Sequence, residues 1–250
     1  MIKAFYQQMA IPEACLLGNR VYKKLFYENG QLTVTDKKSF SDDIVTIYWR
    51  YTLKPETINI ARFQDDERDY PEIAILQVNL KENKHYKRIA QIIQRAIPYP
   101  LLIVFSNGSC LALAVADKRL SRADLDKITV VAFYETEWID LENQTEAEQE
   151  FIESCAIRYF SYQNFYAFYG DLTTRIIAFN CAKLSGSFSL DSDLPREQRI
   201  ENLNTIRQAQ QKLIELRSEL KKESQFNRQV ALNVQIKQLT QEIEHYKVKI

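Results

Sequence analysis

Glu72 and Lys81 are the residues of this sequence that could take part in catalysis, as members of a metal-dependent nuclease site. A nuclease of the restriction-endonuclease type places an acid on one strand and an acid-x-lysine motif on the next strand, followed by a helix. Two carboxylates then bind a divalent cation, and the lysine steadies the attacking water. Residues 72–81, EIAILQVNLK, followed by a helical pattern, have this outline, with Glu72 as one carboxylate and Lys81 as the lysine.

The motif lacks a negative charge at the position where binding of a divalent cation needs one. Asn79 stands two positions before Lys81, Gln77 is also neutral, and a neutral amide is a poor ligand for a hard cation. The preceding loop could compensate with its acids, Asp65, Asp66 and Asp69. Three interpretations stay open: an active nuclease that holds a divalent metal, a nuclease-like fold without its metal site, or Glu72 as a solvated residue at the end of a strand.

Other common catalytic and binding motifs are not found in the sequence. The four cysteines form no C-x-x-C pair and are predicted to be buried cytosolic thiols: Cys15, Cys110, Cys155 and Cys181. His85 and His245 lie in polar surroundings and are expected at the surface. The five glycines form no G-x-G or G-K-[ST] motif, which excludes the usual phosphate-binding loops. We therefore expect no cofactor, and a metal only in the nuclease interpretation.

The elements that would position these residues begin with a mixed region over residues 40–140. Segment 41–53 has apolar residues at helical spacing after Ser41 and predicts an amphipathic helix. The remaining predicted elements are a strand at 57–61, an exposed acidic stretch at 64–71, a buried strand at 72–81, a helix at 83–97, a hairpin at 101–115 around a type I′ turn at Asn107-Gly108, and a strand at 128–138.

The second half of the chain is predicted to be largely helical. Residues 145–179 form an aromatic-rich helical segment whose rings belong mostly to the core. Two helices follow the linker 183–195, with apolar residues at spacings of three and four: Ile200, Leu203, Leu213, Leu216 and Leu220, then Leu232, Ile236, Leu239, Ile243 and Tyr246. The second set is a heptad seam, which favours a helical hairpin forming an antiparallel coiled coil. One long helix with a discontinuity is the competing geometry.

The predicted fold class is α+β, with a mixed, mostly antiparallel sheet, packed helices and a C-terminal helical hairpin. The predicted domains are an α+β domain at 1–142, the aromatic helical segment at 143–182, the linker at 183–195 and the hairpin at 196–250.

The segment KKESQFNRQVALN, residues 221–233, interrupts the two predicted helices with one phenylalanine, Phe226. Phe226 is either an anchor for a partner or a cap on the hairpin's own core, and Asn233 would help to fix register or to bind that partner. The seam residues Leu232, Ile236, Leu239 and Ile243 would dock another chain or a second copy. Lys221, Lys222 and Arg228 are candidates for weak, salt-dependent contact with DNA phosphates.

Charge and hydropathy limit the class of protein. The formal net charge is zero, with an excess of four cations in residues 195–250 and an equal excess of acids in the rest of the chain. This mild polarity permits a nucleic-acid contact without indicating one. No apolar run approaches the roughly 18 residues of a transmembrane helix, and no signal peptide is apparent, so we expect a cytoplasmic protein without a membrane contact.

Four segments together resemble the domain-of-unknown-function family numbered 4391: IVTIYWRYTLKPETINI, PEIAILQVNLKE, IPYPLLIVF and LRSELKKESQFNRQVALNVQIKQL. The family is bacterial and archaeal, has no assigned activity and supplies no catalytic residues. The resemblance implies a setting in phage-defence and restriction-like neighbourhoods, beside a helicase and a DNA methyltransferase. It therefore implies an accessory subunit that works with those enzymes on DNA.

Overall fold

The structure, a computed structural model, describes residues 2–29, 32–121, 128–191 and 194–250. These residues form two compact units, one ending at Ile176 and the other beginning at Ile177. Residues 192–193 of the predicted linker lie outside the described residues. In the described part of the chain, no helix is long and apolar enough to cross a membrane.

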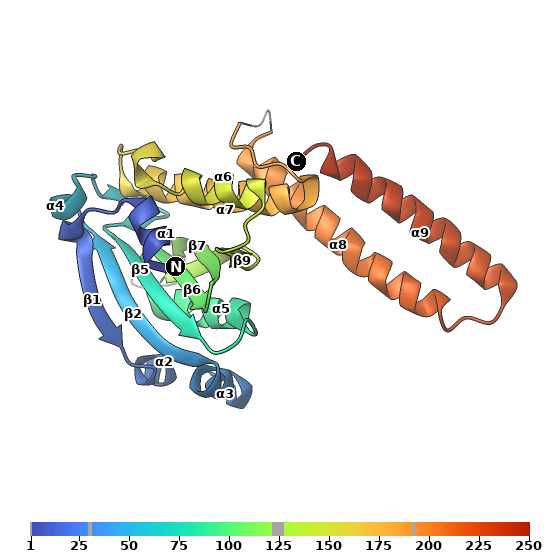
Figure 1. Cartoon of the computed structure of the whole chain (residues 1–250), viewed down its shortest axis with the longest axis horizontal. Coiled ribbons are helices and arrows are strands. Elements are labelled where there is room, and N and C mark those ends of the chain that lie inside the picture. Colours follow the sequence, from blue (N-terminus) through green and yellow to red (C-terminus); the bar gives the residue numbers. More distant parts are fainter. Residues whose placement is uncertain (1, 30–31, 122–127, 192–193) are drawn as a thin grey trace. The chain divides into compact units, whose positions relative to one another are not determined.

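The first unit is built on one mixed sheet with the strand order β1-β2-β5-β6-β7-β8, and β9 pairs with β7 (Figure 1). Its strands are β1 (Leu16–Val21), β2 (Ile44–Leu53), β5 (Ile73–Leu80), β6 (Leu101–Asn107), β7 (Cys110–Leu120), β8 (Ile128–Glu135) and β9 (Ile139–Asp140). β5 and β6 are parallel and the other neighbouring pairs are antiparallel, which confirms the predicted α+β fold class.

The helices and short elements of this unit surround the sheet. They are α1 (Ile2–Met9), the 3-10 helix η1 (Glu13–Cys15), α2 (Lys24–Asn29), α3 (Val34–Asp42), α4 (Pro55–Ile58), the strands β3 (Phe63–Gln64) and β4 (Asp69–Tyr70), α5 (Tyr86–Ala96), α6 (Glu146–Ser154), the 3-10 helix η2 (Ile157–Tyr159) and the first part of α7 (Phe165–Ser185). The predicted strand at 72–81 and helix at 83–97 are confirmed as β5 and α5.

α5 connects the parallel strands β5 and β6 and covers one face of the sheet, together with α2 and α3. Its isoleucines Ile89 and Ile93 are fully buried against side chains of the four central strands, such as Leu76 and Phe105. An ion pair joins α3 to α5: Arg88 Nε lies 2.7 Å from Asp36 Oδ1, and Asp36 also completes the capping box at the start of α3. The Arg88 guanidinium holds the pKa of Asp36 well below its usual range.

α1, α6 and the first part of α7 lie on the other side of the sheet (Figure 1). The rings of Tyr6 on α1 and Tyr51 on β2 have centroids 5.5 Å apart, and α1 contacts α6. The Tyr169 hydroxyl on α7 donates to the Leu101 carbonyl at 3.0 Å and accepts the Ala116 amide proton at 3.0 Å. Most aromatic side chains of 145–179 are buried here, as the sequence predicted, although Tyr159 and Tyr162 are exposed.

The predicted helix at 41–53 is wrong, because α3 ends at Asp42 and the residues from Ile44 to Leu53 form β2. They are mostly β-branched and aromatic, which favours a strand. The helical spacing of Ile44 and Ile47 arises from an irregularity in the pairing with β5 between Ile44 and Thr46. In a regular strand, residues three positions apart lie on opposite faces of the sheet. One extra residue between them, a bulge, places both on the same face. Ile44 and Ile47 both lie in the core against α5.

Two further element predictions need correction. No strand forms at 57–61. The short helix α4 begins at Pro55 in the first helical position and ends at Ile58, and Asn59, whose φ is 56°, caps it. The helical segment 145–179 is two helices, because the Asn164 side chain accepts the Ala167 amide proton at 2.9 Å and starts α7 separately. The order of elements in 40–140 therefore begins with a strand rather than a helix.

The hairpin predicted at 101–115 is confirmed as β6 and β7, with a different turn. Asn107 pairs with Cys110, so the two loop residues are Gly108 and Ser109. Only Gly108 of these has a positive φ, 59°, whereas a type I′ turn needs positive φ at both central positions. The pattern with positive φ at the first position alone is that of a type II′ turn. The strand predicted at 128–138 is confirmed as β8.

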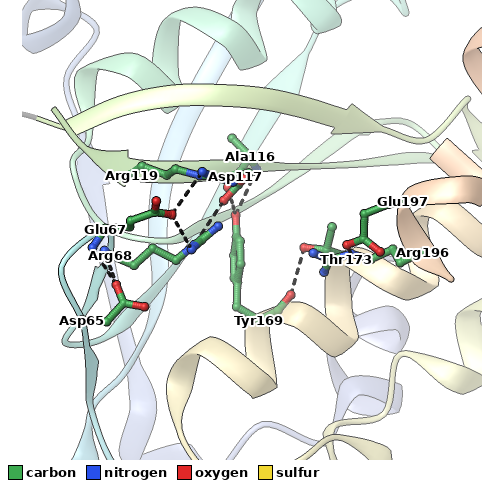
Figure 2. A network of polar contacts seen from close by, with 10 residues as sticks. All are labelled: Asp65, Glu67, Arg68, Ala116, Asp117, Arg119, Tyr169, Thr173, Arg196 and Glu197. Atoms are coloured by element: carbon green, nitrogen blue, oxygen red, sulfur yellow. Dashed lines mark hydrogen bonds and ion pairs between the residues drawn. The ribbon is translucent and has the colours of Figure 1, made fainter. Parts of the chain in front are cut away.

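The acidic stretch 64–71 forms the small β3–β4 hairpin, which a charged network attaches to β7 (Figure 2). Glu67 Oε2 lies 3.3 Å from Arg68 Nη1 and 3.1 Å from Arg119 Nη1, and Arg68 Nε lies 3.8 Å from Asp117 Oδ1. The Leu120 amide donates to the Glu67 carbonyl at 2.8 Å. The stretch is exposed at its tip, as predicted, but Arg68 is mostly covered and Tyr70 at its end is buried.

The second unit contains the end of α7 and two long helices, α8 (Arg196–Leu220) and α9 (Phe226–Lys247). α8 and α9 run side by side as a hairpin (Figure 1). The predicted hairpin is confirmed and the alternative of one continuous helix is wrong, because the chain turns between Lys221 and Gln225. Ile206, Ala209 and Ile243 form the buried core between the helices.

Lys118 on β7 is a buried cation that caps the end of α5. It is 2% exposed, and its Nζ donates to the carbonyls of Ile97 and Tyr99, both at 2.7 Å. These carbonyls follow the last turn of α5, where a helix has acceptors without partners. Burial lowers the pKa of Lys118 to about 7.

We predict that the free energy of unfolding of the sheet unit rises with pH between roughly pH 7 and pH 8.5, by at most about 1.4 kcal/mol per pH unit. In this window the unfolded chain keeps the Lys118 proton and the folded chain loses it, so folding is favoured as pH rises. Urea titrations followed by tryptophan fluorescence report this unit alone, because Trp49 and Trp138 both belong to it.

The substitution Lys118→Met is the control, because it removes this titration and should flatten the rise. The window stops below pH 9 because burial raises the pKa of Cys155 to about 12. Above that pH the folded chain keeps the Cys155 proton that the unfolded chain loses, which opposes the effect of Lys118. An equal slope in wild type and variant would show that Lys118 does not titrate in this range.

Candidate functional site

Glu72 and Lys81, the nuclease candidates, lie at opposite ends of β5. Glu72 precedes its first residue and Lys81 follows its last, so a rise of about 3.3 Å per residue separates them by roughly 30 Å. Glu72 Oε2 lies 3.8 Å from Lys54 Nζ, while the Lys81 amide donates to the Asp43 carbonyl at 2.8 Å. The structure does not bring the two candidates together.

Neutral polar side chains occupy the sheet where the nuclease motif needs acids. Asn79 Nδ2 donates to Thr46 Oγ1 at 2.6 Å, and Asn79 Oδ1 accepts from Gln77 Nε2 at 2.7 Å and from Ser106 Oγ at 2.6 Å. These contacts join β2, β5 and β6. The cluster offers amide and hydroxyl groups that bond to one another, and its observed role is to hold three strands in register.

The loop acids that could have compensated are engaged within their own hairpin. The Asp65 carboxylate accepts the amide protons of Glu67 at 2.8 Å and Arg68 at 2.6 Å, and Asp69 pairs with Arg62 at 3.4 Å. Asp66 is exposed at the tip. Among the described residues, no group of three or more His, Cys, Asp or Glu side chains is placed to hold a metal ion.

The cysteines and histidines have the surroundings that the sequence predicted, with one exception. Cys15, Cys155 and Cys181 are buried, Cys110 is only half-buried, and all four are free thiols. Burial raises the pKa of the three buried thiols, which disfavours the reactive thiolate. Both histidines are exposed, and His85 Nδ1 lies 2.9 Å from Asp43 Oδ2.

The predicted seam residues of α9 face α8. Leu232 and Ile243 are buried, and Ile236 and Leu239 are half-buried. Within the second unit, Leu239 and Tyr246 pack on the core formed by Ile206, Ala209 and Ile243. These residues hold the hairpin together, so in this conformation they do not present a free docking surface.

The turn between the helices is organised by Glu223. Its Oε1 accepts the amide protons of Ser224 and Gln225, both at 2.8 Å, and its carbonyl accepts from Gln229 Nε2 at 2.7 Å. The hydrogen bond from the Gln225 amide makes the largest contribution to holding the pKa of Glu223 below its usual range. Glu223 and Gln229 thus fix the turn. Asn233, which was predicted to fix register or bind a partner, donates to its own helix at the Gln229 carbonyl.

Phe226 does not cap the core of the hairpin, because 75% of the residue is exposed. Two more exposed apolar residues, Val230 and Val234, follow it at intervals of four. At 100° per residue, these three residues lie on the face of α9 opposite the seam centred on Leu239. We call Phe226, Val230 and Val234 the tip stripe. The sequence analysis missed Val230 and Val234, although their spacing from Phe226 was a signal.

Exposed cations occur in the turn between the helices and in the first turn of α9. Lys221, Lys222 and Arg228, the predicted DNA contacts, are all exposed, and Arg228 Nη1 lies 3.7 Å from Glu223 Oε2. From residue 224 to residue 241 the sequence has no acid and two cations, Arg228 and Lys237. The tip therefore combines exposed apolar, amide and cationic groups.

We predict that Leu232→Ala lowers the free energy of unfolding of the hairpin by about 2–3 kcal/mol, because it leaves a cavity between the helices. Val230→Ala should change this free energy by less than about 0.5 kcal/mol. Hydrogen exchange of the α9 amides measures both effects. Exchange should accelerate by roughly thirtyfold or more in Leu232→Ala. Equal acceleration in Val230→Ala would mean that the tip stripe is part of the hairpin core.

The model of one protein family, described as "Domain of unknown function (DUF4391)", matches residues 9–243 of the chain. This match covers nearly all of the sheet unit and of the hairpin, leaving out most of α1 and the end of α9. No curated protein and no solved structure is detectably similar to the chain. The family match confirms the resemblance stated from the sequence: this chain belongs to the DUF4391 family.

Proposed function

We propose that this protein is an adaptor subunit that docks a partner enzyme on the tip stripe of its C-terminal hairpin. The observation that supports this proposal is the exposure of Phe226, together with Val230 and Val234 on the side of α9 that α8 does not cover. Aromatic side chains, phenylalanine among them, are enriched at protein interfaces, where a few large anchors carry most of the binding energy. An antiparallel coiled-coil arrangement of α8 and α9 would present this stripe on a stiff support.

The proposed partners are a helicase, a DNA methyltransferase or both, in a prokaryotic phage-defence or restriction-like system in the cytoplasm. This choice rests on the genomic setting that the family resemblance implies. The sheet unit would provide a second surface for the complex, and self-association through the hairpin is a further possibility. In this proposal the partner enzyme performs the chemistry and the adaptor holds it in place.

A second candidate function is weak, sequence-independent DNA binding by the hairpin tip. The supporting observation is the exposure of Lys221, Lys222 and Arg228 beside a stretch of α9 that has no acids. Phosphate contacts of this kind displace counterions and position a protein on DNA without reading bases. Such a contact is compatible with an adaptor for DNA-processing enzymes.

The adaptor proposal predicts that the double variant Phe226→Ser, Val230→Ser loses its partner enzyme. The chain is co-expressed with the proteins encoded beside it, purified through a tag and weighed by native mass spectrometry, with a helicase or a DNA methyltransferase as the expected partner. Recovery of the partner should fall by about tenfold or more, because removal of a hot-spot aromatic side chain costs at least about 2 kcal/mol.

Val248→Ser is the matched control, since Val248 is 88% exposed on the same unit but lies beyond the end of α9. It should keep the partner. If wild-type protein is recovered alone, or if the stripe variant retains the enzyme as well as the control does, the adaptor proposal is wrong.

For DNA, we predict that the logarithm of the binding constant falls linearly with the logarithm of the salt concentration. The slope should be about −2 to −3, as expected for two or three phosphate contacts. Lys221→Gln with Lys222→Gln should make the slope shallower by about 2. The adjacent exposed pair Lys37 and Lys38 on α3 provides the control, and its double Gln variant should keep the wild-type slope. Mobility-shift titrations at several salt concentrations measure these slopes, and tight binding insensitive to salt would contradict the phosphate-contact model.

A further inference from the structure

Two arginines supply all the charge on four neighbouring strands of the sheet. β1, β2, β5 and β6 contain no acidic residue, and their cations are Arg20 on β1 and Arg50 on β2. Among the described residues, neither arginine has an ion pair with an acid. This part of the sheet therefore carries positive charge that no side chain of its own strands neutralises.

Strand pairing places both arginines on the same face of the sheet. Arg20 pairs with Tyr48, and Tyr48 pairs with Gln77, so these three side chains share one face. Arg50 reaches the same side, because its guanidinium carbon lies 5.3 Å from the ring centre of Tyr6 on α1. We call Arg20, Tyr48 and Arg50 the arginine face.

The arginine face is accessible to solvent, unlike the opposite side of the same strands. Ile47 and Val78, which point to the α5 side, are 1% and 0% exposed. Arg20 is exposed, and Tyr48 and Arg50 are half-buried. β1 and β2 extend well beyond α1, the helix that lies on this side at one end of the two strands (Figure 1). A ligand can therefore reach the two arginines.

Two buried donors at the border of the arginine face lack acceptors. The Tyr6 hydroxyl and Arg50 Nε are both buried, and neither has a hydrogen-bond partner among the described residues. Tyr6 as a whole is 5% exposed. Buried polar atoms without partners are costly, and native proteins contain few of them. An acceptor supplied by a ligand would satisfy these donors, and an anionic acceptor would also pair with the Arg50 charge.

The positive charge continues beyond the ends of the strands. β1 and β5 run in the same direction, because both are antiparallel to β2, so Lys23 and Lys81 follow them at the same end of the sheet. Burial lowers the pKa of Lys23 and so does the charge of Lys81, while Asp42 raises it and Arg20 lowers it again. Arg20 is thus close to two more cations, with Asp42 as the acid that opposes them.

We propose that the arginine face binds single-stranded nucleic acid, with Arg20 and Arg50 on phosphates and Tyr48 against a base. The strand spacing and the rise per residue put the Cα atoms of the two arginines roughly 8 Å apart, so their long side chains can reach neighbouring phosphates. Proteins that bind single strands combine such cations with aromatic rings on which bases stack. An unpaired base can stack on Tyr48, whereas a duplex keeps its bases inside.

Fluorescence anisotropy with a labelled oligothymidylate strand of about 16 nucleotides measures this binding on the full chain. Arg20→Gln and Arg50→Gln should each weaken binding by about threefold or more at low salt. The double variant should make the slope of log binding constant against log salt shallower by about 1.4, because each phosphate contact on a single strand contributes about 0.7. Tyr48→Leu should weaken binding by about fivefold or more and keep the slope, because it removes stacking and no charge.

Arg95→Gln is the matched control. Arg95 is exposed on α5, which covers the opposite face, and its guanidinium carbon lies 5.1 Å from the ring centre of Phe133. It therefore resembles Arg50 in charge and in its aromatic neighbour, and its variant should bind as wild type does. Arg20→Gln keeps the test valid if Arg50→Gln fails to fold, because Arg20 is exposed.

The site lies in the sheet unit and rests on neither function proposed for the hairpin. The variant Lys221→Gln, Lys222→Gln should keep single-strand binding, so failure of the tip contact with DNA and failure of this proposal are distinguishable. Four outcomes would overturn the proposal: no binding of the strand at low salt, equal binding by the Arg20→Gln and Arg95→Gln variants, loss of binding in the Lys221, Lys222 variant, or a duplex of the same length that competes as well as the single strand.

Discussion

The parallel pairing of β5 and β6 is the constraint on which the sheet unit depends. Parallel neighbours require a crossover connection, and their strands are usually buried on both faces. α5 provides the crossover here, and the two strands consist of nearly continuous apolar runs with residues such as Leu76 and Ile103 fully buried. The antiparallel strands β2 and β7 then extend the sheet from either side of this pair.

Burial on both faces raises a second requirement, because polar groups at the ends of α5 and β6 must find partners inside the protein. Lys118 donates to the carbonyls that follow α5, Gln94 Nε2 donates to the Leu101 carbonyl at 2.8 Å, and Tyr169 reaches the same carbonyl from α7. The Tyr86 hydroxyl donates to the Thr136 carbonyl at 2.9 Å. These buried contacts stabilise the fold. Lys118 therefore has a structural role, and the large shift of its pKa by burial does not require a catalytic one.

The surfaces left for function lie away from this core. The neutral cluster around Asn79 bonds to itself, and the seam of the hairpin is used within the hairpin. Accessible side chains that could bind a ligand remain on the arginine face and at the tip stripe, one in each unit. Both are surfaces that a binding protein could use, which favours an accessory role.

The sequence by itself determined the elements whose side-chain pattern is uninterrupted. α5 and the two C-terminal helices follow from apolar residues at helical spacing, whereas β5 and the β6–β7 hairpin follow from short continuous apolar runs bounded by turn residues. β2 was mistaken for a helix because its bulge gives Ile44 and Ile47 a helical spacing, and bulges depend on the neighbouring strand. The separation of Glu72 from Lys81 follows from the unbroken β5 between them. Only the tertiary structure decided that Phe226 faces outward and that Arg20 and Arg50 share an open face of the sheet, because exposure depends on which elements pack against a residue, and local sequence does not encode that.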